Sequence, residues 1–141
     1  MCSSDLLSDR QVVAMAIEAE GAERDLGTWQ RVADSESPGA IEEAAFQGLW
    51  LQPAAKGAGS VLAGIRLLEA ALQTVNAVTK EPQMPSLYFF EGACPILWEE
   101  LEGMRWAEDR PGKEPAPAPG PDHGPDALRY ILQLRQSLGF R

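Results

Sequence analysis

Two acids and the only histidine of the chain lie together near its C-terminal end. Asp122 and His123 precede Gly124-Pro125, and Asp126 follows where a helix is expected to begin. A carboxylate binds hard divalent cations, and an adjacent imidazole can bind metal or transfer a proton. An aspartate at a helix N-terminus also caps free amide groups and interacts favourably with the helix dipole. The residue types alone therefore fit either a metal site or a helix cap.

Asp34 is the second candidate for chemistry. It follows the short, bulky segment 29–33 and precedes Ser37-Pro38, a pair typical of a helix N-cap and its first residue. We therefore expect a buried strand that delivers Asp34 to the edge of a sheet. An ordinary turn residue before a helix is the alternative.

The pattern of apolar residues predicts the elements that must position these side chains. Ser8 and Gln11 have the form of a capping box, which predicts a helix up to about residue 20. Strands alternating with helices predict an α/β structure with mainly parallel strands. The further helices are expected at 38–47, 60–80, 95–101 and 126–138, and the strands at 29–33, 49–52, 87–90 and, at an edge, 104–106.

Composition limits the classes of function. The 141 residues carry a formal net charge of -9, so the chain has no broad basic surface for wrapping nucleic acid. Two cysteines and one histidine fit neither a disulfide framework nor a zinc site, which favours a reducing, intracellular setting. The sequence shows no signal peptide and no run long enough for a membrane span. We expect the four tryptophans to pack in the core and not to stack on bases.

The run from Asp122 to Tyr130 resembles the signature near the end of the nuclease domain of tailed-phage large terminases. In that resemblance Asp126 matches the last metal-binding aspartate, and His123 matches a histidine beside the metals. An independent match covers residues 32–65, in which Asp34 corresponds to the middle catalytic aspartate of a strand-acid-helix-strand-helix passage. A third match covers residues 87–106, so the likeness extends over nearly all of 8–140.

The resemblance implies an α/β, RNase H-like fold in which a mixed sheet is flanked by helices. It implies a site for two Mg²⁺ or Mn²⁺ ions held by Asp34 and Asp126, with His123 as an auxiliary ligand or proton-transfer group. Lys56 is the cation expected nearest to the DNA phosphates, although an ordinary solvated loop lysine fits equally well. The implied activity is endonucleolytic cleavage of concatemeric double-stranded DNA during genome packaging in the host bacterial cytoplasm, with the portal and the small terminase subunit as partners.

The chain departs from the family pattern at its beginning. The first strands of the domain, which carry the first metal-binding aspartate, would lie before Ser8, and no phosphate-loop motif of the motor domain occurs. We therefore expect this chain alone to cleave DNA weakly or not at all. The expected organisation is a non-native leader at 1–7, a partial nuclease domain at 8–110, a proline-rich loop at 111–125 and the last helix of the same domain at 126–141.

Three alternatives remain open from sequence. The proline-rich loop is either a simple linker or an active-site flap. The chain could be a non-catalytic assembly or DNA-clamping module that keeps the fold without the reaction. It could also belong to another RNase H-like class, such as resolvases or integrases, since a shared fold does not fix the function.

Overall fold

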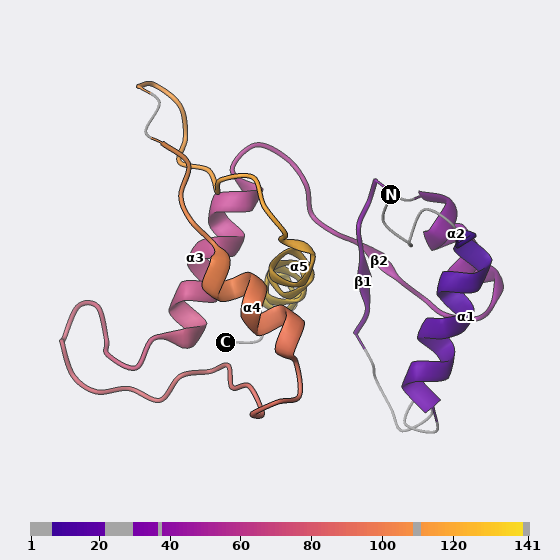
Figure 1. Cartoon of the computed structure of the whole chain (residues 1–141), viewed down its shortest axis with the longest axis horizontal. Coiled ribbons are helices and arrows are strands. Elements are labelled where there is room, and N and C mark those ends of the chain that lie inside the picture. Colours follow the sequence, from indigo (N-terminus) through magenta and orange to yellow (C-terminus); the bar gives the residue numbers. More distant parts are fainter. Residues whose placement is uncertain (1–6, 22–29, 37, 109–110, 140–141) are drawn as a thin grey trace. The chain divides into compact units, whose positions relative to one another are not determined.

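The computed structural model describes residues 7–21, 30–36, 38–108 and 111–139. The chain divides into two compact units, Met1–Ala54 and Ala55–Arg141. The described residues of the first unit form two helices and two short strands, and those of the second unit form three helices. Figure 1 labels each of these elements. The predicted α/β class is therefore confirmed for the described residues, and each unit is considered separately below.

The first unit begins with helix α1 (Asp9–Glu20), whose N-terminus is closed by a capping box. The side-chain oxygen of Ser8 accepts a hydrogen bond from the Gln11 N–H at 3.4 Å, and the Gln11 side chain accepts one from the Ser8 N–H at 2.9 Å. The capping box thus satisfies the Ser8 N–H and gives the Gln11 N–H, which also donates to the Ser8 carbonyl at 2.9 Å, a second acceptor. The predicted start and end of this helix are both confirmed.

A strand-helix-strand passage follows α1 in the first unit. Strand β1 (Val32–Ala33) and strand β2 (Gln52–Pro53) pair in parallel, and helix α2 (Pro38–Phe46) connects them. The Gln52 N–H donates to the carbonyl of Arg31 at 2.9 Å, and the Ala54 N–H donates to the carbonyl of Ala33 at 2.7 Å. The predicted parallel pairing is confirmed, although β2 begins at the last residue of the segment predicted for it.

The core of the first unit is small. Val13 of α1, Ala44 of α2 and Leu49 are buried together, and Ile17 and Leu51 pack against them. Leu49 lies three residues after the end of α2, and its N–H donates to the carbonyl of Ala44 at 2.8 Å, which turns the chain inward. Leu49 and Leu51 therefore contact the core, whereas Trp50 between them is exposed, and the strand begins only after this segment.

An ion pair ties the end of α1 to the residue before β1. Arg31 donates from Nε and Nη2 to the two carboxylate oxygens of Glu20 at 2.6 and 2.7 Å, and both side chains are 17% exposed. Such a two-point arrangement is strong because both partners are charged and planar. The hydrogen bond to Glu20 is the main cause that raises the pKa of Arg31, against the opposing effect of burial.

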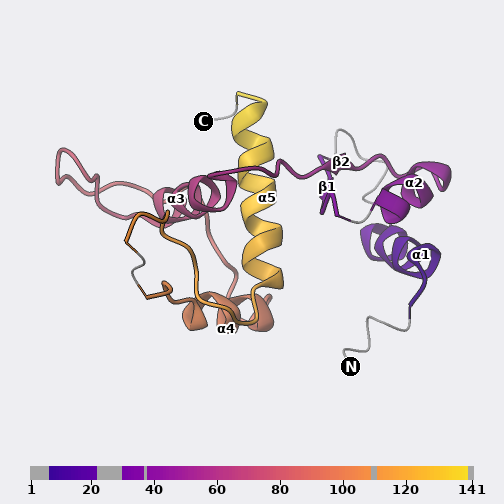
Figure 2. The same cartoon turned by 90° about the horizontal axis from the view of Figure 1, so that it is seen from above.

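The second unit consists of α3 (Ser60–Leu72), α4 (Pro95–Gly103) and α5 (His123–Ser137). Helix α5 packs against both α3 and α4, as Figure 2 shows. Gly64 lets α3 approach α5 closely, because its missing side chain leaves room for the aliphatic part of Arg129. Gln133 adds a hydrogen bond from Nε2 to the carbonyl of Ser60 at 2.7 Å.

Helix α3 ends at Leu72, eight residues before the predicted end near residue 80. The cause is a turn at Asn76, whose side-chain oxygen accepts hydrogen bonds from the Val78 and Thr79 N–H groups at 2.9 and 3.0 Å. Asparagine favours such turns because its side chain competes with helical backbone bonding. The pattern of apolar residues that predicted the longer helix therefore extends beyond Leu72, the last helical residue.

The strand predicted at 87–90 is wrong, since these residues have no strand partner. The N–H groups of Ser86 and Leu87 instead donate to the carbonyl of Ala71 at 2.9 and 3.2 Å, which holds the segment to the end of α3. The predicted edge strand at 104–106 is reduced to one bridge between Trp106 and Pro117. The proline-rich segment therefore runs back along 105–107 at this point.

Two further expectations are corrected. Helix α5 starts at His123 and not at Asp126, so Asp126 lies within its first turn. The three described tryptophans are not core residues: Trp50, Trp98 and Trp106 are 77%, 50% and 49% exposed, while Trp29 lies outside the described residues. Bulk and apolar character predicted burial, but each of these three side chains keeps about half of its surface or more exposed.

Candidate functional site

Asp126 lies in the first turn of α5 with its carboxylate held by a neighbour. Its Oδ1 accepts hydrogen bonds from Nη2 and Nε of Arg129 at 2.8 and 3.3 Å. The Asp126 side chain is 39% exposed, whereas that of Arg129 is 7% exposed. The guanidinium also lies over the ring of Tyr130, 4.7 Å from its centre. Arg129 therefore pairs with an acid of its own helix, three residues earlier.

His123 is the first residue of α5 and is exposed to solvent. Neither it nor Asp122 caps the helix through its side chain. That role falls to Glu100 of α4, whose Oε2 accepts a hydrogen bond from the Gly124 N–H at 2.7 Å. A carboxylate at this position satisfies a free amide and interacts favourably with the helix dipole.

Sequence reasoning did not include Glu100 among the candidate residues. The available signal was Gly124: a side chain here would lie 2.8 Å from Cδ1 of Leu97 and 2.9 Å from Oε2 of Glu100. A glycine next to a proline at a helix start is consistent with close approach by another element. The partner of that approach could not be identified from the sequence.

A cleft of about 520 Å³ lies beside Asp126 within the second unit. Its apolar lining comes mainly from α3 and the proline-rich segment 117–121, and its charged lining comes from α4, Arg105 and the start of α5. His123 is not among its lining residues. The charged lining residues are Glu99, Glu100, Arg105, Asp122, Asp126 and Arg129.

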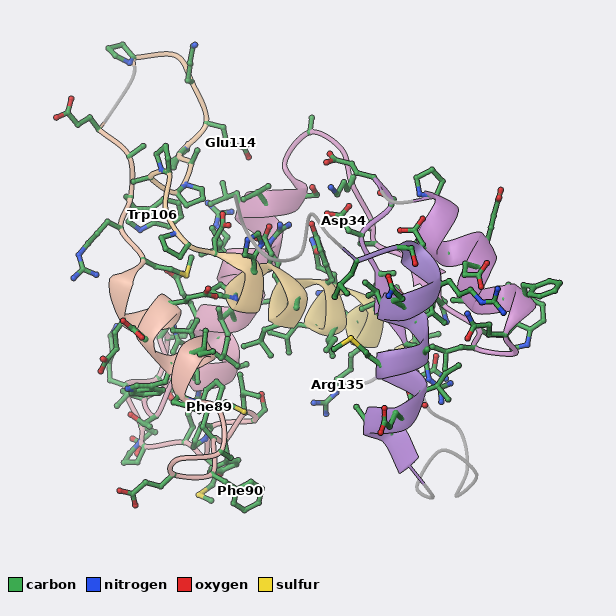
Figure 3. The ribbon with its side chains drawn as sticks, turned by 45° about the vertical axis from the view of Figure 1, so that its right-hand side comes forward. Asp34, Phe89, Phe90, Trp106, Glu114 and Arg135 are labelled. Carbon is green, nitrogen blue, oxygen red and sulfur yellow. The ribbon has the colours of Figure 1, made fainter. Side chains whose placement is uncertain are left out.

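Asp34 directly follows β1 in the first unit, as predicted, but the two residues of this strand are half-buried and not buried as expected. Its Oδ1 accepts a hydrogen bond from the Glu36 N–H at 2.9 Å, which forms a tight turn into α2. Figure 3 labels Asp34 on this turn. Lys56 lies three residues after β2, in the loop that leads to α3, and belongs to the second unit.

His123 and Asp126 therefore share the first turn of α5, but only Asp126 lines the cleft. Asp34 belongs to the other unit, so its meeting with Asp126 stays a prediction. In the described ranges, no three or more histidine, cysteine, aspartate or glutamate side chains form a group that could hold a metal ion. Among the same residues, no helix has the length and apolar character needed to cross a membrane.

Comparisons with known proteins add no relative. No family model, curated protein or solved structure matches this chain. The functional argument therefore depends on the residues and their geometry.

Proposed function

We propose that this chain is the later part of a large-terminase nuclease domain with an RNase H-like fold. The observation that carries the proposal is the position of Asp34, immediately after β1 of a parallel β1–α2–β2 passage. In open α/β sheets, ligand-binding residues lie beyond the carboxyl ends of the strands. The order of elements through β1, α2, β2 and α3 agrees with the sequence resemblance over the same residues.

In the proposed site, Asp34 and Asp126 supply hard oxygen ligands and His123 assists as a ligand or proton-transfer group. Mg²⁺ or Mn²⁺ would supply the charge that activates water and stabilises the leaving oxygen of a phosphodiester. Carboxylates are suitable ligands for these cations, but this chain supplies two of the three metal-binding aspartates of the family. Lys56 would contact the DNA backbone, and double-stranded DNA, the portal and the small terminase subunit would be the partners in the host cytoplasm.

Isothermal titration with Mn²⁺ tests whether the two aspartates bind metal. We expect weak binding by the wild-type chain and its loss in both Asp34→Asn and Asp126→Asn. Asp9→Asn is the matched control, because Asp9 is an exposed aspartate at the start of α1. If both site variants bind Mn²⁺ as the control does, the nuclease proposal fails.

A plasmid-nicking assay with Mn²⁺ tests the expected lack of activity. Two carboxylates should hold the cations too weakly for efficient cleavage, so we expect little or no nicking. Robust nicking that disappears in Asp126→Ala would contradict the view that the site is incomplete.

A non-catalytic assembly or DNA-clamping module with the same fold is the second candidate. The ion pair between Asp126 and Arg129 favours it, because the guanidinium already supplies the positive charge that a cation would provide. Such a module would show neither Mn²⁺ binding nor an effect of Asp34→Asn in the titration. The two candidates are therefore separated by one measurement.

A further inference from the structure

A second hollow, of about 420 Å³, lies where the segment before α4 meets that helix. Figure 3 labels Phe89 and Phe90 on this segment. None of the proposed nuclease residues Asp34, His123 and Asp126 is among its lining residues, although Glu99 lines both this hollow and the cleft beside Asp126. The lining residues are Phe89, Phe90, Glu91, Gly92, Cys94, Pro95, Trp98, Glu99 and Glu102.

Aromatic rings form the apolar part of this hollow. Phe89 and Trp98 meet edge to face, with ring centres 5.8 Å apart and planes at 69°. Trp98 is 50% exposed and Phe90 is 88% exposed, so ring surface is open to a ligand. The Ala93 N–H donates to the carbonyl of Phe90 at 3.1 Å, which holds the segment in a turn before the helix.

Negative charge surrounds these rings. Glu91 precedes α4, and Glu99 and Glu102 lie one turn apart on it. The described residues that line the hollow include no lysine, arginine or histidine. This charge excludes nucleic acid and anionic lipid as occupants, and it favours a cation that can also contact an aromatic ring.

We propose that this hollow binds an arginine side chain from a basic peptide segment of a partner protein. A guanidinium is planar and weakly hydrated, so it can stack on Trp98 while donating hydrogen bonds to Glu99 or Glu102. Phe90, which lines the hollow, and Ile96, which is 72% exposed in the first turn of α4, provide apolar surface for the residues that flank the arginine. A peptide therefore uses more of this surface than an isolated cation.

Fluorescence polarisation with a labelled peptide, in which one arginine is flanked by leucines, tests the proposal. The same peptide with citrulline keeps the shape of arginine but removes its charge. We expect the arginine peptide to bind at least fivefold more tightly than the citrulline peptide, and to bind more weakly as salt increases. Equal affinity of the two peptides overturns the proposal.

Variants of the chain locate the binding site. Trp98→Ala should lower the affinity for the arginine peptide at least fivefold. Glu102→Gln should lower it about two- to fivefold, and this variant keeps every aromatic ring in place. The controls are Trp50→Ala, another exposed tryptophan, and Glu69→Gln, an exposed glutamate outside the hollow. Equal effects of site and control variants overturn the assignment. Concentration-dependent dimerisation that is lost in Trp98→Ala would identify a second copy of the chain as the occupant and would also overturn it.

Discussion

Replacing Gly64 with alanine tests the packing of α3 against α5. A methyl group at this position would overlap Cγ and Cδ of Arg129 and would lie 3.3 Å from Cδ of Gln133. Arg129 is 5% exposed, so its aliphatic part has little room to move aside. Moving it would also disturb its hydrogen bonds to Asp126 and its contact with Tyr130.

Three contributions determine the size of the effect. Alanine in a helix interior is favoured over glycine by about 1 kcal/mol. Overpacking costs about 1–3 kcal/mol, and weakening a charged hydrogen bond that is partly exposed costs about 1–2 kcal/mol. The unfavourable contributions exceed the gain, so we expect Gly64→Ala to lower the free energy of unfolding of the second unit by about 2–3 kcal/mol.

Native-state hydrogen exchange measures this change helix by helix. A loss of about 2–3 kcal/mol corresponds to about 30- to 150-fold faster exchange of the most protected α5 amides, since about 1.4 kcal/mol is tenfold. Gly103→Ala in α4 is the matched control, because nothing lies within 4 Å of the added methyl group. Slower or unchanged exchange in Gly64→Ala would refute the proposed close packing of the two helices.

Three further substitutions test contacts in the two units. Glu20→Gln should destabilise the first unit by about 1–2 kcal/mol in urea denaturation, because it weakens the ion pair with Arg31. The raised pKa of Arg31 means that this stabilisation is complete below the ordinary pKa of arginine and is lost only above it, so the loss should be the same at neutral and mildly alkaline pH. Gly124→Ala should destabilise the second unit by about 1–3 kcal/mol in thermal denaturation, because the new methyl group would lie 2.9 Å from Oε2 of Glu100; an unchanged melting temperature would contradict this. Ser8→Ala should speed exchange in the first turn of α1 by about fivefold, from a lost cap of about 1 kcal/mol, and equal protection would show that the capping box contributes nothing.

Local signals in the sequence predicted the elements well where side chains and backbone act within a few residues. The capping box at Ser8 and Gln11 located the start of α1, and Pro95 marked the beginning of α4. The parallel pairing of β1 and β2 followed from the alternation of strand and helix. These features depend on hydrogen bonds and dihedral preferences that short patterns encode.

Contacts between distant segments were not predictable in the same way. The apolar run at 87–90 resembles a strand, but its backbone is held by the end of α3 at Ala71. The cap of α5 comes from Glu100, 24 residues earlier in the chain. The position of Asp34 after a strand was predicted from sequence, and its partnership with Asp126 stays a prediction.

The two edges of the two-stranded sheet differ in how well they could pair with an added strand. The hydrogen bonds between β1 and β2 use the carbonyls of Arg31 and Ala33, so the alternating backbone directs the amide and carbonyl of Val32 to the other side. On β2 the corresponding residue is Pro53, which has no N–H to donate. A strand added beside β1, which leads into Asp34, would therefore find both a donor and an acceptor. A strand added beside β2 would find only an acceptor.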